Sequence, residues 1–316
     1  MRNIKLDRKS FLRSVAIAGA MAGLPTMTLR AADEKKNTKK RLLRVAHVTD
    51  IHVQPGKIPE YGMAKAMNMV NNLPDHADFV ISGGDAIMDA CGNPKDKVKA
   101  MWQTFHSIWK SDNSLQGYHT VGNHDLYNIS KSASNFAEHK KWACDEFQIA
   151  KPYHFFDKDT WRFIVLDSIH PKVIPGYVGL LDAEQMDWFK KTLADTPSDR
   201  FICLVSHIPV IAACTMFDGE NNHHHLWRIR GSNLHADAKQ LKDLFVAHKN
   251  VKACLSGHIH LVDEVEYLGV RYYCNGAVSG GWWGGNYHEF PPVFAVMNFY
   301  DDGSNDRELY FYDWKA

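Results

Sequence analysis

The sequence predicts a layered α/β fold with a β-rich C-terminal part. In the first two thirds of the chain, short apolar runs typical of strands alternate with stretches whose apolar residues recur at helical intervals. Beyond residue 250 the helical pattern stops and only strand-like runs follow. Strands that alternate with helices are typical of sheets covered by helices. We therefore expect a layered α/β domain that ends in strands.

The first 32 residues read as an export signal. Basic residues precede the apolar stretch Val15–Leu24, and the small residues Ala31 and Ala32 offer a cleavage point. The apolar stretch is shorter than the roughly 20 residues that span a bilayer, which disfavours a membrane anchor. The segment Asp7–Arg13 resembles a twin-arginine export signal in which a lysine replaces the second arginine. We expect an exported, periplasmic protein, with the export route left open.

The charge balance of the mature chain disfavours some classes of binding partner. Without residues 1–32 the chain has 31 basic and 35 acidic side chains, a net charge of −4. This balance is unlike that of a nucleic-acid reader, so no nucleic-acid polymer and no stable membrane insertion are expected. The basic run within residues 33–41 reads as a solvated linker, which leaves residues 42–316 as the domain. The oligomeric state has no signature in the sequence.

The expected elements follow in chain order. Five stretches have helical periodicity, namely Met63–Leu73, Lys95–Trp109, Ala137–Phe147, Ala183–Leu193 and Leu241–Ala247. Strand-like runs form the tail, at Val262–Leu268, Val270–Asn275, Val293–Tyr300 and Glu308–Asp313. The segment Ala212–Leu234 has no clear period and is expected to be a functional or mobile loop.

Five further apolar runs each end in side chains that can bind a metal ion. These side chains are Asp50, His52, Asp85, Asn123, His207, His258 and His260. A single tract such as Gly122–Asp125 is also what a turn after a strand needs, but its recurrence at five strand ends favours a shared site. Strand carboxyl ends meet at one edge of an α/β sheet, so we expect convergence.

The number of these side chains indicates two metal ions. One ion needs three or four protein ligands, and this set has seven candidates. One aspartate shared between two ions roughly 3.5 to 4 Å apart accounts for the set, and such a pair suits phosphoryl displacement. Mixed oxygen and imidazole donors suit manganese, iron or zinc alike.

The same residues resemble the five-part signature of the calcineurin-like metallophosphoesterases, in family order. The matching blocks are Asp50-x-His52, Gly84-Asp85, Gly122-Asn123-His124-Asp125, His207 and Gly257-His258-x-His260. The resemblance extends over residues 42–316 and implies a β-sandwich flanked by helices. It implies an enzyme that hydrolyses small-molecule phosphate esters.

The resemblance also implies how the ligands divide. One ion would be held by Asp50, His52, Asp85 and His260, and the other by Asp85, Asn123, His207 and His258. Asp85 would bridge the two ions, and a hydroxide between them would be the nucleophile. His124 would stay off the metals, face the substrate and act as general acid.

Positions where this sequence departs from the family pattern indicate which branch of the family it resembles. Purple acid phosphatases have a metal-binding tyrosine where Met88 stands. Protein serine/threonine phosphatases have an aspartate there followed by Arg-Gly, whereas Asp89 comes one residue later and is followed by Ala-Cys. Whether Asp89 orients His124 is therefore open. The stretch Gly276–Gly285 looks most like the bacterial cyclic-nucleotide phosphodiesterase branch, which favours a phosphodiester substrate.

Two other functions remain on the sequence evidence. A phosphomonoesterase or pyrophosphohydrolase acting on nucleotides or sugar nucleotides is the first alternative. A non-catalytic, metal-binding exported protein is the second, and the presence of all seven candidate ligands together with His124 argues against it.

Several residues have both a functional and a structural interpretation. Trp282 and Trp283 either stack on a base or sugar or cap the core. Packing, surface or loop positions are favoured for His223–His225, His235 and His288. Asn275 ends a strand near the expected site, and turn chemistry explains it equally well. Of the six cysteines, those in apolar runs, such as Cys203 and Cys254, favour reduced core thiols over a disulfide framework.

Overall fold

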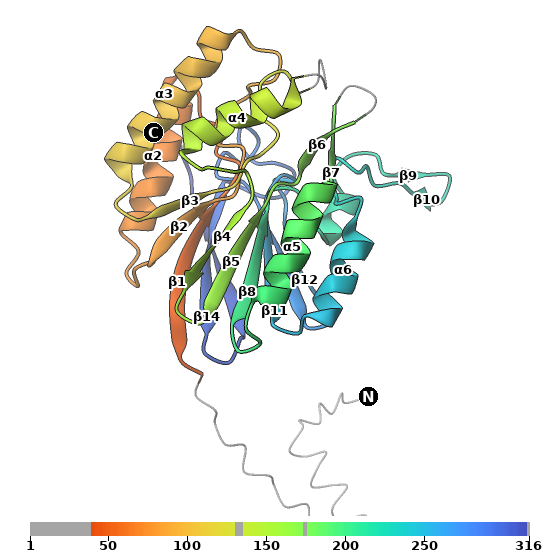
Figure 1. The fold of residues 1–316 in the computed structure, drawn as a ribbon. Helices are drawn as coiled ribbons and strands as arrows, with labels where there is room; N and C mark the ends of the chain where they lie inside the picture. The colour runs from red at the N-terminus through yellow and green to blue at the C-terminus, as the bar shows by residue number, and fades with distance from the viewer. Residues whose placement is uncertain (1–38, 130–134, 173–175, 315–316) are drawn as a thin grey trace, which may run out of the picture. The chain divides into compact units, whose positions relative to one another are not determined.

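The computed structural model describes residues 39–129, 135–172 and 176–314 (Figure 1). The expected leader, residues 1–32, and most of the expected linker lie outside the described residues and stay predictions. The first strand begins at Arg41, so the last residue of the expected linker belongs to the sheet. None of the helices in the described part combines the length and apolar character that crossing a membrane requires.

The first of two large sheets has five strands in the order β15-β14-β1-β2-β3. These strands are β1 (Arg41–Val48), β2 (Phe79–Ser82), β3 (Gly117–His119), β14 (Val293–Tyr300) and β15 (Asn305–Phe311). β1, β2 and β3 run parallel, and β14 pairs antiparallel with both β1 and β15.

The second large sheet has six strands in the order β12-β13-β11-β8-β5-β4. These strands are β4 (His154–Lys158), β5 (Trp161–Leu166), β8 (Phe201–Ser206), β11 (Val251–Ser256), β12 (Val262–Tyr267) and β13 (Val270–Asn275). The four central strands are parallel, and the edge strands β4 and β12 are antiparallel. Two small hairpins accompany the sheets, β6 (Ile169–Pro171) with β7 (Tyr177–Gly179) and β9 (Asn222–His223) with β10 (Leu226–Trp227).

The two sheets pack face to face because alternate strand residues point to opposite sides. Val45 of β1 and Phe79 of β2 join Phe163 of β5 in the core between the sheets. Their chain neighbours Ala46 and Val80 point the other way, into the core beneath the helices. Each central strand is therefore buried on both faces, as sheets covered by helices require.

Helices cover both outer faces of the sandwich (Figure 1). The first sheet is covered by α2 (Lys57–Asn71), α3 (Lys95–Asp112) and α4 (Phe136–Phe147), and the second by α5 (Ala183–Asp195) and α6 (Ala238–Ala247). At the start of α5, the Asp182 side chain accepts a hydrogen bond from the Gln185 amide at 2.8 Å and so caps the helix. The expected β-sandwich flanked by helices, with a β-rich end, is confirmed.

Some element boundaries differ from those expected. α2 begins six residues before Met63 and includes Pro59, which the first helical turn accepts because its amide needs no partner there. The sequence analysis named no strands between residues 150 and 180, where β4 to β7 lie. β6 and β7 have three residues each, too few for a period, whereas the apolar run of β5 is a signal that the sequence does contain.

The expected loop Ala212–Leu234 contains a 3₁₀ turn at Ala213–Met216 and the β9–β10 hairpin. No disulfide joins the six cysteines, all of which lie in the described residues, and five of them are buried. The burial agrees with core positions for these thiols, and their redox state stays a prediction.

Candidate metal centre

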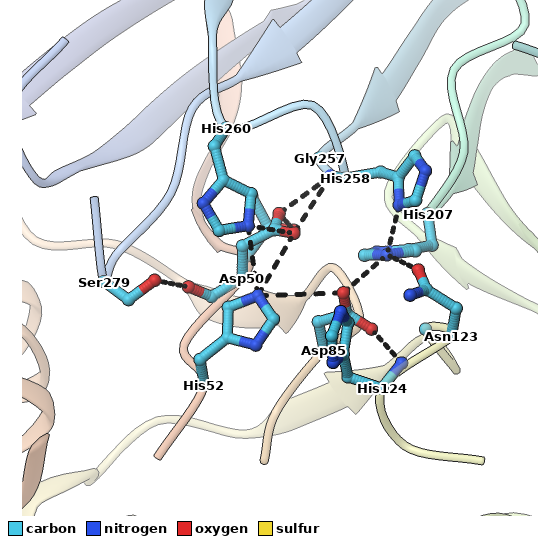
Figure 2. Close-up of polar contacts among 12 residues, drawn as sticks. Asp50, His52, Asp85, Asn123, His124, His207, Gly257, His258, His260 and Ser279 are labelled. Atoms are coloured by element: carbon cyan, nitrogen blue, oxygen red, sulfur yellow. Dashed lines mark hydrogen bonds and ion pairs between the residues drawn. The ribbon is translucent and has the colours of Figure 1, made fainter. Parts of the chain in front are cut away.

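The seven predicted ligands meet in one buried cluster beyond the carboxyl ends of β1, β2, β3, β8 and β11 (Figure 2). Three groups of donors each lie within 4.8 Å of one another, Asp50 with His52 and His260, Asp85 with His207 and His258, and His52 with Asp85 and His124. Parallel strands end at the same edge of a sheet, which is why residues distant in sequence converge there.

Asp85 lies between the first two of these groups. One of its carboxylate oxygens, Oδ2, is 3.1 Å from His207 Nε2 and 3.7 Å from His52 Nε2. Asn123 Oδ1 is 3.2 Å from the same His207 nitrogen, and His260 Nε2 is 3.3 Å from Asp50 Oδ1. Asp85 is thus placed to contribute to both halves of the expected division, which itself stays a prediction.

Backbone carbonyls orient all four ligand histidines. His207 Nδ1 donates to Gly83 O at 2.9 Å, and His260 Nδ1 donates to Gly280 O at 2.6 Å. His52 Nδ1 lies 3.3 Å from Met88 O, and His258 Nε2 lies 2.8 Å from Ser232 O. A carbonyl can only accept, so each of these nitrogens carries the proton and the other ring nitrogen is left with a lone pair.

Those lone pairs point at one another. His52 Nε2 and His260 Nε2 are 3.0 Å apart, and His258 Nδ1 and His207 Nε2 are 3.3 Å apart. When the imidazoles are neutral, neither contact has a proton to share, because the opposite nitrogens donate to carbonyls, and the remaining neighbours are carboxylate and amide oxygens. A pocket lined by such acceptors favours cations, so the donor set fits the two divalent ions that the family generally uses.

The electrostatics of the cluster also favour positive charge. Burial opposes charging of the His207 imidazole, yet the carboxylates of Asp85 and Asp50 raise its pKa to about 10. Asp50 and Asp85 are themselves almost fully buried, at 0% and 1% exposure. Two buried carboxylates require compensation, and divalent cations would supply it in place of a proton.

The backbone is strained at the ligands. Five of the seven have positive φ, namely Asp50 (55°), His52 (50°), Asp85 (53°), His258 (70°) and His260 (60°). Residues other than glycine seldom adopt this conformation, and such strain concentrates at functional sites. It allows Asp50 and His52, and likewise His258 and His260, to turn toward one centre.

Glycines precede several ligands because the elements pass too close for a side chain. A Cβ on Gly122 would overlap the carboxylate of Asp85, and a Cβ on Gly257 would overlap Asp50 and Thr49. This close approach explains why a glycine precedes Asn123 and His258 in the sequence. A preference for glycine in turns does not by itself explain it.

Asp125 supports the cluster without belonging to it, a function that the sequence analysis did not assign. Its carboxylate accepts hydrogen bonds from the amides of Gly122 (2.8 Å), Asp85 (3.0 Å) and Ala86 (2.9 Å). It thereby ties the end of β3 to the loop after β2. The signal in the sequence was its place in the Gly122–Asp125 tract.

His124 lies beside the ligand set, with a ring nitrogen within 4.8 Å of donor atoms of His52 and Asp85, and its expected place off the metals stays a prediction. Its side chain is 29% exposed, and its ring makes an edge contact with His52 at 4.8 Å between centroids. Nδ1 lies 3.3 Å from Asp89 Oδ1, which answers the open question about Asp89. Burial lowers the pKa of His124, but the negative charges of Asp85 and Asp89 outweigh it and raise that pKa to about 9.

A loop after β13 closes the side of the cluster near Asp50. Ser279 Oγ donates to Asp50 O at 2.8 Å (Figure 2), and Trp283 Nε1 donates to His52 O at 2.9 Å. Trp283 is buried and packs in the core, whereas Trp282 is 40% exposed and its ring lies 4.3 Å from that of His260. Trp283 therefore caps the core, and the exposed Trp282 is the member of the pair that is free to stack on a ligand.

The remaining histidines and Asn275 lie outside the cluster. His235 is buried between Ser206 Oγ and Asp237 Oδ1, at 3.0 and 2.8 Å, and is a packing residue. Exposed positions are occupied by His223, His224, His225 and His288. Asn275 is buried 2.9 Å from His47 Nδ1, and its amide faces the core.

A helix-flanked β-sandwich with an Asp, Asn and His cluster at its strand ends defines the class of metallophosphoesterases. Residues 43–262 match the family model of the calcineurin-like phosphoesterases, and the chain belongs to this family. The family places it among phosphoric ester hydrolases.

Two curated relatives match shorter stretches. The 3′,5′-cyclic adenosine monophosphate phosphodiesterase CpdA of Escherichia coli strain K12 is 27% identical over 150 residues, 48% of this chain and 45% of the relative. A probable cyclic nucleotide phosphodiesterase of Synechococcus is 30% identical over 100 residues, 32% of each chain. The matched stretches thus span less than half the length of these relatives.

Among solved structures, a dimetal phosphatase from Danio rerio has a similar fold. The TM-score is 0.60 at 14% identity, and the match covers 83% of this chain and 94% of that one.

Proposed function

We propose that the protein is an exported phosphodiesterase that uses two divalent cations and has His124 as its general acid. The observation that carries this proposal is the pocket of acceptors formed by Asp50, His52, Asp85 and the other candidate ligands, with the imidazole of His124 beside it. Both curated relatives are named as phosphodiesterases of cyclic nucleotides, which supports a diester over a monoester.

In this proposal the candidate ligands bind the cations, and His124 transfers the proton. When bound, the cations would neutralise phosphate charge and lower the pKa of an attacking water. His124 donates to a phosphoryl oxygen or to the leaving alcohol, and its ring, 29% exposed, is open to solvent beside the cluster. The Asp89 carboxylate, 3.3 Å from Nδ1, favours the protonated form of the imidazole and so supports its role as a proton donor.

The test of the proposed function compares wild type and His124→Ala on phosphodiesters whose leaving alcohols have graded pKa. A positioned general acid typically contributes about 100- to 10,000-fold in rate, so kcat/KM should fall by that much for basic leaving groups. The loss should shrink for very acidic alcohols, which need no proton. His223→Ala, an exposed histidine in β9, is the matched control and should retain full activity.

The result decides between functions as well as between mechanisms. A deficit that is equal across the series would show that His124 binds or stabilises charge and is not the acid. Hydrolysis of phosphomonoesters or of pyrophosphate bonds in nucleotides or sugar nucleotides, with no diester cleaved, would favour that alternative. Retention of both metals without any hydrolysis would favour a non-catalytic binding protein.

Export is a separate part of the proposal. It rests on the succession of basic, apolar and small residues through Ala32. Intact-mass measurement on protein from the periplasm of the native host should show that residues 1–32 have been removed. A full-length cytoplasmic species would contradict export.

A further inference from the structure

We propose that Trp282 is a stacking platform for a planar heteroaromatic group on the ester, which makes nucleobase-bearing phosphate esters the substrate class. This inference rests on the proposed phosphodiesterase function and names the substrate class for the same site. It concerns the indole beside the metal cluster, which no part of the general mechanism uses.

The loop after β13 separates two adjacent indoles. Trp283 is 5% exposed and Trp282 is 40% exposed. Both have positive φ, 67° and 50°, a conformation that bulky side chains rarely adopt. For Trp283, packing in the core and the hydrogen bond to His52 O offset the cost of the strained backbone. Trp282 forms no such anchor, yet the same strained turn holds its ring at the surface.

Trp282 lies directly beside two of the candidate metal ligands. Its ring centroid lies 4.3 Å from His260, with the planes tilted by 31°, and 5.8 Å from His52. Among the exposed large apolar side chains of the described residues, Trp282 is the one with ring contacts to ligand histidines. An ester whose phosphate lies at the cluster would therefore have its organic group within reach of the exposed indole.

The platform is supported from the side by Tyr287. The ring of Tyr287 meets Trp282 edge to face at 5.3 Å and 90°, and its hydroxyl donates to Asp218 Oδ1 at 2.7 Å. The other oxygen of Asp218 accepts from Asn233 Nδ2 at 2.8 Å. The segment between β8 and α6 thus locks the tyrosine that props the indole, and a platform held in this way loses little entropy when a ring stacks on it.

The chemistry of an indole selects the ligand. A π-face stacks on any nucleobase with about 1–3 kcal/mol per base, and it offers no comparable contact to a glycerol group, which has neither a ring nor a positive charge. The polar groups of the cluster are committed to metals and phosphate, so Trp282 is the group that can discriminate the organic part of the ester. Stacking is tolerant of base identity, which predicts acceptance of both purines and pyrimidines.

The experiment compares 3′,5′-cyclic AMP with the 3′,5′-cyclic phosphate of methyl riboside, which lacks only the base. Stacking energies of 1–3 kcal/mol correspond to about 5- to 150-fold, so Trp282→Ala should raise KM for cyclic AMP by that factor. The kcat, the metal content and the KM for the base-free ester should stay within about twofold. Trp282→Phe should recover most of the loss.

Trp227→Ala is the matched control, because Trp227 is 50% exposed on β10 and has no ring contact with the ligand histidines. It should leave both substrates unaffected. Equal losses of Trp282→Ala on both substrates would overturn the platform, since a residue that merely shields His260 has no preference for the base.

A binding measurement keeps this inference distinct from the proposed function. Adenosine has no phosphate to bind the cations, so calorimetry on metal-loaded wild type and Trp282→Ala reports stacking directly. Wild-type binding that weakens in the variant supports the platform even if no diester is hydrolysed, in which case only the proposed function fails. Equal adenosine affinity in the two proteins would overturn the platform even if diester hydrolysis is found.

Discussion

At the scale of single residues, Asp85 has the most demanding position in the cluster. It is buried, it has a strained backbone, and its carboxylate faces His207 on one side and His52 on the other. A shared carboxylate both binds and offsets the repulsion between two cations, whereas an amide carries no charge to do so.

We predict that Asp85→Asn lowers the occupancy of both metal positions together. Metal analysis of dialysed protein by mass spectrometry measures the effect, and less than one equivalent in total is the expected result. Asn123→Ala, which alters a ligand of one half only, should weaken mainly one ion. Two equivalents bound to Asp85→Asn with wild-type affinity would show that Asp85 is no bridge.

The glycines beside the ligands give a second prediction at this scale. In Gly257→Ala the new methyl group would overlap Asp50 and Thr49, so the chain around His258 must shift. Disturbed support of a ligand typically weakens metal binding by about 10- to 100-fold, and competition with a chelator measures it. Gly231→Ala, whose nearest neighbour is a flexible Val178 methyl at 3.1 Å, is the control. Unchanged affinity in Gly257→Ala would contradict the close approach.

At the scale of elements, the strand order explains both the site and the weak points of the fold. The ligands follow parallel strands, of which β3 is an edge strand and the other four are internal, whereas β15 is the opposite, antiparallel edge of the first sheet. β15 is tied to the sheet by the buried Arg44 of β1, whose guanidinium meets Glu308 at 2.5 and 2.9 Å and Asn298 of β14 at 2.8 Å. This bidentate contact spans three strands.

We predict that the contact between Arg44 and Glu308 makes the stability of the fold depend on pH in the acid range. The hydrogen bonds from Arg44 lower the pKa of Glu308 to about 2, below the unfolded value of about 4.3. The contribution of Glu308 to the free energy of unfolding is therefore fully present above about pH 4.3 and is lost as the pH falls toward 2. With its side chain 45% exposed, solvent screening reduces the contribution to about 1 kcal/mol.

Urea unfolding of metal-free wild type and Glu308→Gln measures this contribution. The difference in the free energy of unfolding should be about 1 kcal/mol at pH 6 and should diminish at pH 3. Arg162 and Asp157, a pair on neighbouring strands of the other sheet, provide a comparison through Asp157→Asn. A difference for Glu308→Gln that does not change with pH would show that the contact acts through packing and not through charge.

At the scale of the whole molecule, the cluster joins the two sheets, because its ligands come from β1, β2 and β3 on one side and from β8 and β11 on the other. Buried carboxylates and opposed imidazole lone pairs leave this joint under repulsion when no cation is bound. Metal binding and stability are therefore linked.

We predict that a chelator lowers the melting temperature measured by calorimetry and that added manganese or zinc restores it. A ligand at 100 times its dissociation constant stabilises a protein by about 2.7 kcal/mol per site, which corresponds to several degrees for a domain of this size. Asp85→Asn should show a smaller response, because its site binds less metal. A melting temperature that is unaffected by demonstrated metal removal would contradict the link.

Much of this architecture is encoded locally. Helical periodicity marked all five helices that the structure describes, and the strand-like runs that precede the ligands coincide with β1, β2, β8 and β11. The seven candidate ligands were identifiable because Asp, Asn and His recur at strand ends, and the structure brings them together. Their binding of metal stays a prediction.

The sequence by itself determined the layered fold, the candidate ligands and the family, because these depend on periodicity and on residue types at strand ends. Only the tertiary structure decided what depends on contacts between distant segments. It showed the support that Asp125 gives to the loop after β2, the contact of Asp89 with His124, and the division of the tryptophan pair into a buried Trp283 and an exposed Trp282. Periodicity reports which face of an element is buried, but it carries no information on which distant backbone carbonyl or carboxylate that face will meet.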